Sequence, residues 1–235
     1  MTAGFWKRLN TLYERLLLLP LIVILLISAW CVYDNWYVYG HSTDTDILRY
    51  KPGPSGEMNS PDGREISGDM VAWVTVDDTG IDYPIMQADD NLKYLNTDPF
   101  GDYSLSGSIF LDSRNASDFS DPYSIVYGHH MDHGKMFGAL DSFLNESYLR
   151  AHDTGTLMIG RNAEKVCRLE VFAAMRADAR SEDLFNPEGS DDVPGCIRRN
   201  AEVFINERND RILALSTCAG DDLLARTIVF CYILE

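Results

Sequence analysis

The sequence predicts a mainly β domain, built as an eight-stranded barrel with peripheral helices and preceded by one N-terminal transmembrane helix. Three observations support this fold class: an uncharged apolar run near the N-terminus, eight short β-type segments after it, and helical segments between those strands. With 235 residues and 46% hydrophobic side chains, the chain can bury a substantial core.

The net charge argues against one large class of partner. The chain carries 36 acidic and 20 basic side chains, for a formal charge of -16 at pH 7. Most of its surface therefore repels a polyanion, and we expect no nucleic-acid partner.

The uncharged run occupies residues 16–33, and its eighteen positions are close to the lower length of a helix that crosses a bilayer. Basic residues precede the run, whereas Asp34 and a strongly acidic remainder follow it. Because basic flanks stay on the cytoplasmic side, this pattern predicts a cytoplasmic tail at 1–15, a transmembrane anchor at 16–33 and an exported remainder.

Two other interpretations of the run are weaker. A cleaved signal peptide needs a small-residue site after the run, but Ser28-Ala29-Trp30-Cys31 puts tryptophan where a lipoprotein site needs a small residue. A buried helix of a soluble protein is disfavoured because the run is apolar on all faces and lies at the N-terminal end of the chain.

The rest of the chain divides at a segment rich in proline and glycine. Residues 34–65 are predicted to form an N-terminal helix and linker, because Lys51-Pro52-Gly53-Pro54-Ser55-Gly56 interrupts any regular structure. Residues 66–235 form the predicted folded domain.

The folded domain is predicted to begin with a hairpin, in which Asp77-Asp78-Thr79-Gly80 joins Val71–Val76 to Ile81–Gln87. Six further segments favour strands, and eight strands in all favour a barrel. These segments are Gly107–Asp112, Ser124–His129, Thr154–Gly160, Lys165–Ala174, Arg211–Cys218 and Thr227–Leu234. Helices are predicted at Asn91–Asn96, Met136–Leu149 and Val193–Asn206.

The five cysteines are too few and too scattered for a disulfide scaffold, and none forms a Cys-x-x-Cys pair. A buried cysteine more often acts as a small hydrophobe than as a reactive group. The residues around each cysteine therefore decide which of these two roles is predicted for it. Cys218 ends a predicted strand, on a face that turns polar at Ser216. A strand end that borders a loop can hold a thiol rigidly and still expose it. By contrast, Cys167 and Cys231 lie within strands among aliphatic residues.

Arg226 stands at the start of the strand after Cys218, with seven residues between them. An antiparallel pairing would bring both to one end of the sheet, where opposed residues are about 5 Å apart at Cβ. A guanidinium there would favour a thiolate and hold a developing oxyanion. A solvated charge at the strand end is the competing interpretation of Arg226.

A thiol with a reference pKa of about 8.5 needs a nearby base or cation to become an effective nucleophile. Three of the five histidines, His129, His130 and His133, cluster after the strand that ends near Gly128. We take His129, directly after this glycine, as the proton carrier. A metal site at the cluster is disfavoured by its spacing and by the lack of matching carboxylates. A papain-like protease is disfavoured by the order of the residues, since papain-like chains place cysteine before histidine.

Taken together, these segments resemble the sortase family, and specifically class B. The resemblance runs from about Val71 to the end of the chain. It rests on Asp90-Asn91-Leu92-Lys93-Tyr94-Leu95-Asn96, Gly107-Ser108-Ile109-Phe110-Leu111-Asp112, Tyr127-Gly128-His129-His130-Met131, Met136-Phe137-Gly138, Leu215-Ser216-Thr217-Cys218 and Arg226, in that order.

The resemblance implies a sortase-type β-barrel in which residues 66–235 are the catalytic domain, and Val193–Asn206 corresponds to an extra class B helix. It also implies a cysteine transpeptidase with a catalytic set of His129, Cys218 and Arg226. Cys218 would attack the threonine carbonyl of a sorting motif in a secreted protein. The acyl-enzyme would then pass to an amine of a cell-wall precursor or a pilin. By the same resemblance, the substrate groove is lined by Asn91, Leu95 and Ser216.

We expect no cofactor and no metal, because the acidic residues around Asp77, Asp89 and Asp112 are too dispersed to act as calcium ligands. The expected location is the cell membrane of a Gram-positive bacterium, with a single span and the catalytic domain on the extracellular face. Two other functions stay open: an exported cysteine endopeptidase that passes the acyl group to water, and a non-catalytic, membrane-tethered binding module.

Overall fold

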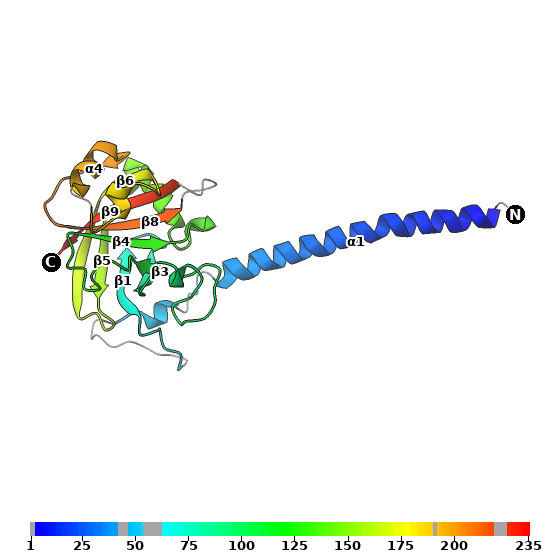
Figure 1. The fold of residues 1–235 in the computed structure, drawn as a ribbon, viewed down its shortest axis with the longest axis horizontal. Helices are drawn as coiled ribbons and strands as arrows, with labels where there is room; N and C mark the ends of the chain where they lie inside the picture. Colours follow the sequence, from blue (N-terminus) through cyan, green and yellow to red (C-terminus); the bar gives the residue numbers. More distant parts are fainter. Residues whose placement is uncertain (1–2, 42–46, 54–62, 190–191, 219–224) are drawn as a thin grey trace. The chain divides into compact units, whose positions relative to one another are not determined.

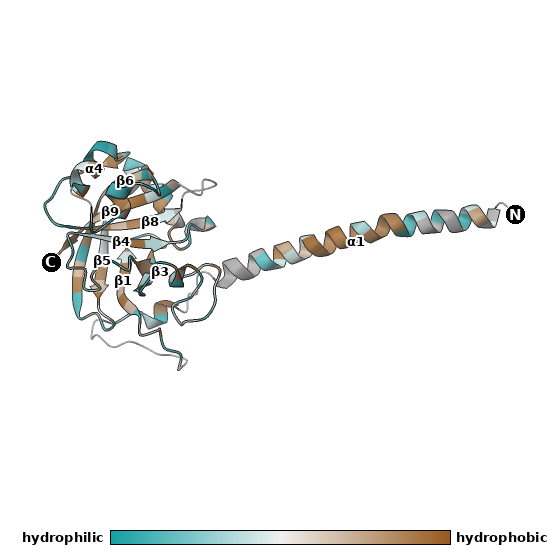
Figure 2. Cartoon of the chain, in the orientation of Figure 1, coloured by the Kyte–Doolittle hydropathy of each residue, from teal (hydrophilic) through white to brown (hydrophobic). Residues whose placement is uncertain are grey.

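The computed structural model describes residues 3–41, 47–53, 63–189, 192–218 and 225–235, and the chain divides into two compact units, Met1–His41 and Ser42–Glu235. The first unit is one helix, α1 (Ala3–His41). Its stretch Tyr13–Asp34 has a mean hydropathy of 2.7 and none of it is buried, and Figure 2 shows the corresponding brown band. Among the described residues it is the one helix that is long and apolar enough to cross a membrane. The predicted span at 16–33 lies wholly inside α1.

The second unit is a closed β-barrel, as the sequence predicted (Figure 1). Its strands neighbour one another in the order β5-β1-β2-β3-β4-β8-β9-β6, and a pairing of β5 with β6 closes the ring. The eight strands are β1 (Met70–Val76), β2 (Asp82–Met86), β3 (Ile109–Leu111), β4 (Tyr123–Gly128), β5 (Thr154–Ile159), β6 (Lys165–Asp178), β8 (Arg211–Cys218) and β9 (Ala225–Leu234).

One strand was not predicted from the sequence. The short β7 (Val203–Phe204) pairs with β6 at Ala173 and Ala174. It occupies part of the segment predicted as the helix Val193–Asn206, so that prediction was too long. The helix α4 (Val193–Asn200) begins after Asp192, whose side chain caps it by accepting from the Gly195 amide, and it ends where Ala201 turns extended.

The predicted helix Met136–Leu149 is two helices in the structure. Asn145 separates η4 (Gly138–Leu144) from α2 (Glu146–Ala151), because its side chain accepts hydrogen bonds from the first amides of α2 and its backbone is extended. The remaining helices are short: η1 (Ile47–Tyr50), η2 (Lys93–Leu95), η3 (Asp132–Gly134) and α3 (Glu182–Phe185).

Both faces of β8 and β9 are buried. The barrel interior holds alternate residues of these strands, such as Leu215 and Val229, together with Leu140 and Phe143 of η4. The other face packs against α3 and α4. Its cluster includes Ala214, Ile228 and Phe230 of the strands with Leu184, Cys196 and Ile197 of the helices. Two packed faces explain why β8 and β9 read as nearly continuous apolar runs in the sequence.

Candidate active site

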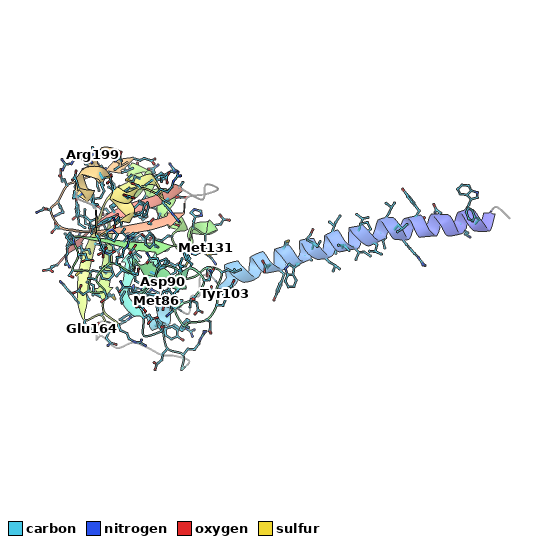
Figure 3. All side chains as sticks on the ribbon, viewed as in Figure 1. Met86, Asp90, Tyr103, Met131, Glu164 and Arg199 are labelled. Carbon is cyan, nitrogen blue, oxygen red and sulfur yellow. The ribbon has the colours of Figure 1, made fainter. Side chains whose placement is uncertain are left out.

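Three strand ends meet at one edge of the barrel. β4 and β8 lie side by side and run in the same direction (Figure 1), and Gly128, the last residue of β4, pairs with Thr217. β9 starts beside the end of β8 and runs back along it, so that Cys218 pairs with Arg226. His129 is the next residue after Gly128. Figure 3 labels Met131, which follows the two histidines, at this side of the barrel.

The predicted antiparallel pairing of Cys218 with Arg226 is confirmed at the level of the backbone, because the two residues are direct partners in the β8–β9 register. Directly opposed residues in such a pair have Cβ atoms about 5 Å apart. The side chain of Cys218 and the residues 219–224 after it lie outside the described part of the chain.

The alternation of side chains places these positions on one face of the sheet. Ala214 of β8 and Ile228 of β9 belong to the cluster under α3 and α4. Residues two or four positions further along a strand share its face. Positions 218 and 226 therefore lie on this face.

The electrostatics of His129 connect it to Arg226. Burial of the half-buried imidazole lowers the pKa of His129, and the positive charge of Arg226 lowers this pKa further. Both effects disfavour the imidazolium form. His129 follows β4 and Arg226 lies in β9, on either side of the end of β8.

The neighbouring His130 has different partners. Its Nε2 lies 3.0 Å from Oδ2 of Asp141 in η4, and Oδ1 of Asp141 accepts a hydrogen bond from the Thr227 hydroxyl at 2.6 Å. The histidine pair is therefore divided between two environments: His129 interacts with Arg226, whereas His130 is held by Asp141. Among the described residues, no group of three or more His, Cys, Asp and Glu side chains is arranged to hold a metal ion.

The three predicted substrate-binding residues lie in different surroundings. Ser216 lies on β8 two positions before Cys218, and its buried hydroxyl has no hydrogen-bond partner within the described residues. Leu95, in η2, is half-buried against the same apolar cluster as Tyr127. Asn91 donates to Asp112 at 3.0 Å and accepts from the Ser113 amide at 2.8 Å, so both ends of its amide are held inside the protein.

Sequence reasoning missed Asp112, which joins Asn91 to Arg114 and Tyr127. Its fully buried carboxylate accepts from Tyr127 Oη at 3.0 Å, from Asn91 Nδ2 at 3.0 Å and from Arg114 Nε and Nη2 at 2.9 and 2.8 Å. Burial alone would raise the pKa of Asp112, but the bonds from Arg114 and Tyr127 outweigh it and hold this pKa below its usual range. An aspartate after a short apolar strand gives no local sign of such a role.

Arg114 extends this network to the helical layer. Its Nη2 donates to the Phe185 carbonyl oxygen at 2.8 Å and its Nη1 to the Asn186 side chain at 3.2 Å, which ties α3 to the end of β3. Tyr127 of the same network responds electrostatically to Arg226, although burial has the larger effect and raises the pKa of Tyr127. Asp112 thus links the Asn91 segment, β4 and α3.

Comparison with known proteins identifies the family. A sortase domain profile matches residues 74–233, which reach from β1 to β9. The chain belongs to the sortase family.

The relatives of this sortase are class B enzymes, as the motifs predicted. Sortase B of Listeria monocytogenes is 30% identical over 228 residues, which cover 90% of this chain and 92% of the relative. The crystal structure of a Streptococcus pyogenes class B sortase involved in pilus biogenesis matches with a TM-score of 0.64 and 36% identity, over 71% of this chain and 93% of that one. A Staphylococcus aureus sortase B-substrate complex matches with a TM-score of 0.64 and 27% identity, over 72% of this chain and 82% of that one.

The sortase fold and these relatives make the chain a cysteine transpeptidase. The residues that carry the reaction are predicted from the motifs. The Asp112 network and the position of His129 relative to Arg226 supply two measurable consequences.

The first consequence concerns stability. Asp112→Ala is expected to lower the free energy of unfolding by roughly 3 kcal/mol, because Arg114, Tyr127 and Asn91 lose a buried, charged acceptor. Urea denaturation at neutral pH measures the change. The loss should shrink as the pH falls, since a carboxylate with a lowered pKa contributes stability above its unfolded pKa and loses it as the pH drops through its folded pKa.

The chain offers a matched control for this variant. Asp178 and Arg180 make the same two-residue-apart pair, with bonds of 2.9, 3.0 and 2.8 Å, but both side chains are exposed. Asp178→Ala should leave the urea midpoint nearly unchanged. Equal losses from both substitutions would show that the burial of Asp112 is not what makes it important.

The second consequence concerns the pKa of His129. Arg226→Met should raise this pKa, because a neighbouring positive charge no longer opposes the imidazolium, while burial keeps it below the usual value for histidine. A pH titration of the His129 ring by NMR measures the change. Arg168→Met removes an exposed positive charge from β6, near the other end of β9, and should leave the titration unchanged. An unaltered His129 pKa in Arg226→Met would mean that the two groups do not interact.

Proposed function

We propose that this sortase is a membrane-anchored transpeptidase that cleaves a C-terminal sorting motif of secreted proteins after threonine, by way of a thioacyl-enzyme on Cys218. The acyl group then passes to an amine of a cell-wall precursor or a pilin. The observation that carries the proposal is the pairing of Cys218 with Arg226 at the strand end that His129 adjoins.

The first half of the reaction forms the thioester. The Cys218 thiolate attacks the threonine carbonyl carbon, and the carbonyl oxygen becomes an oxyanion beside the Arg226 guanidinium. The peptide C–N bond then breaks as the His129 imidazolium gives its proton to the leaving amine. A lowered pKa suits this role, because it makes the imidazolium of His129 a stronger acid than an ordinary histidine.

The second half reverses these steps with a new amine. The acceptor amine attacks the thioester carbonyl, His129 takes its proton, and the C–S bond breaks to return the Cys218 thiolate. The products are an amide on the acceptor and the enzyme in its starting state. If water attacks in place of the amine, the same residues yield a hydrolytic endopeptidase.

Arg226 has two functions in this scheme. Its guanidinium stays protonated at any workable pH, so it favours the thiolate over the thiol and stabilises the oxyanion. Its charge also disfavours the protonated imidazole of His129. Arg226 therefore favours the thiolate of Cys218 and opposes the imidazolium of His129.

A peptide-library assay tests the function. The full-length chain in detergent micelles is given peptides with varied C-terminal motifs, with and without an added amine such as triglycine, and the products are read by mass spectrometry. A transpeptidase forms the amine adduct, whereas an endopeptidase gives only the hydrolysed peptide. A non-catalytic binding module gives neither, and an alkylating agent would then label no cysteine of the native domain.

We further propose that α1 anchors the enzyme through residues 16–33, with the domain on the extracellular face of a Gram-positive cell. The basic residues before the apolar stretch and the acidic domain after it support this orientation. The substrate partners are then secreted proteins that arrive at the same membrane surface.

The orientation predicts a protease experiment. Protease added to wall-stripped cells should digest the domain beyond Asp34 and leave a membrane-bound stub, as seen on an immunoblot against a tag at the N-terminus. Cells opened with detergent provide the control for complete digestion. Full protection of the domain in intact cells would reverse the proposed orientation.

A further inference from the structure

The carboxylate of Asp141 joins two strands that are not neighbours in the sheet. β8 lies between β4 and β9. Asp141 nevertheless contacts His130, just beyond β4, at 3.0 Å and accepts a bond from Thr227 of β9 at 2.6 Å. It therefore spans β8 at the level of Thr217, which is the register partner of both Gly128 and Thr227.

The two residues that Asp141 contacts, and Thr217 between them, are each the covalent neighbour of a predicted catalytic residue. His130 follows His129, Thr227 follows Arg226, and Thr217 precedes Cys218. Neighbouring residues of a strand point to opposite faces. Thr227 and Thr217 are buried on the interior side of the barrel, whereas positions 218 and 226 lie on the other face. The carboxylate of Asp141 thus contacts the strand ends on the face opposite to positions 218 and 226.

The helix that carries Asp141 is firmly fixed. Leu140 and Phe143 on either side of it are fully buried in the barrel interior. The segment leading into η4 is bonded to the histidine segment, because the Phe137 amide donates to the His129 carbonyl oxygen at 3.1 Å. Gly138 approaches the Met131 carbonyl so closely that a Cβ atom would collide with it. A fixed carboxylate can hold two strand ends at a defined separation.

We propose that Asp141 is a positioning residue, which sets the separation of His129 and Arg226 by holding His130 and Thr227 across the strand that bears Cys218. The effect on the reaction rests on the proposed function, whereas the effect on the distance between imidazole and guanidinium does not. A small displacement of a catalytic group costs up to about 10²-fold in rate.

Two substitutions at position 141 distinguish the effect of the hydrogen bonds of Asp141 from the effect of its negative charge. Asp141→Asn and Asp141→Ala both remove the negative charge, but the amide of asparagine can still accept from Thr227 and donate to a neutral His130. We expect Asp141→Ala to lower kcat by about 10- to 100-fold with KM within threefold of the parent. Asp141→Asn should stay within about threefold of the parent in kcat.

A measurement without substrate makes the test independent of the proposed function. Arg226 and burial are the influences that lower the pKa of His129, while Asp141 and His130 lie on the opposite face. If Asp141→Ala lets His129 and Arg226 move apart, its His129 ring should titrate at a higher pH than in Asp141→Asn. An NMR titration of both full-length variants decides this even if no peptide is cleaved.

Matched variants keep the test decisive. Glu146→Ala removes a nearby exposed carboxylate that pairs with Arg150, and both readouts should stay at the parent level. Should Asp141→Ala fail to fold, Thr227→Val removes the other hydrogen bond and Thr227→Ser preserves it. The valine variant should lose several-fold in kcat, and the serine variant less than twofold. Equal kcat and equal His129 titration in the alanine and asparagine variants, or in the valine and serine variants, would overturn the proposal.

Discussion

Cys218→Ala is expected to abolish both cleavage of the sorting peptide and transfer to an amine, with a loss of at least about 10⁴-fold in kcat. Among the described residues at the strand end, no hydroxyl group can replace the thiol as nucleophile, because Ser216 on the same face is buried and Thr217 and Thr227 lie in the barrel interior. The folded state should be kept, since the substitution falls at the last position of β8. Mass spectrometry of peptide products measures the loss.

The other cysteines of the barrel provide the controls. Cys167 and Cys231 are buried in the interior, and burial raises the pKa of the Cys231 thiol to about 12, so that this thiol stays protonated and out of reach. Cys167→Ala and Cys231→Ala should therefore retain activity, apart from any loss of stability through the small cavities that they create. Substantial turnover by Cys218→Ala would end the assignment of the nucleophile.

His129→Ala should lose nearly all turnover, by about 10²- to 10⁴-fold, because general acid–base assistance contributes this much. His130→Ala should keep most of its activity, with a similar pH profile. The structure supports the distinction: His129 interacts with Arg226, whereas His130 faces Asp141 and Thr227. Initial rates with one peptide and one amine suffice to separate the two variants.

The proposed positioning role of Asp141 allows a more specific expectation for the activity of His130→Ala. His130→Ala loses one of the two contacts of Asp141 and keeps the bond to Thr227, so its loss of activity should stay below about twofold. A circular dichroism melt of each variant controls for folding. If His130→Ala were the inactive protein and His129→Ala the active one, the assignment of the proton carrier would be wrong by one residue.

The strands of the barrel and their pairing at the site could be predicted because both depend on local patterns. Alternation and turn residues indicated eight strands, and the short interval between Cys218 and Arg226 indicated an antiparallel pair. The interval between His129 and Cys218 carries no such information. Their proximity depends on the parallel pairing of β4 with β8, which only the motifs of a known family could anticipate.

The errors at the helices have tertiary causes. Val203 and Phe204 extend a helix-like pattern, but they form a strand because the edge of β6 at Ala173 and Ala174 is open to them. Asn145 reads as an ordinary residue within Met136–Leu149, yet its side chain caps a new helix and ends the previous one.

The contacts of Asp112 and Asp141 could not be predicted from the sequence, because they too depend on tertiary structure. Both carboxylates join segments that meet only in the folded barrel: Asp112 joins Asn91, Tyr127 and α3, and Asp141 joins the ends of β4 and β9. In a sequence alone, an aspartate on a solvated surface looks the same as an aspartate that bridges distant segments.

The parallel pairing of β4 with β8 also governs when the enzyme becomes active. Parallel strands cannot form from a local hairpin, and contacts between distant parts of a chain form late because the long intervening loop must first be closed. The chain between β4 and β8 contains β5, β6, α3 and α4. A nascent sortase that emerges unfolded would therefore carry its thiol and its imidazole on separate, unconnected stretches. We expect it to remain inert towards passing proteins until the barrel has closed, which makes the topology itself a safeguard against premature acylation.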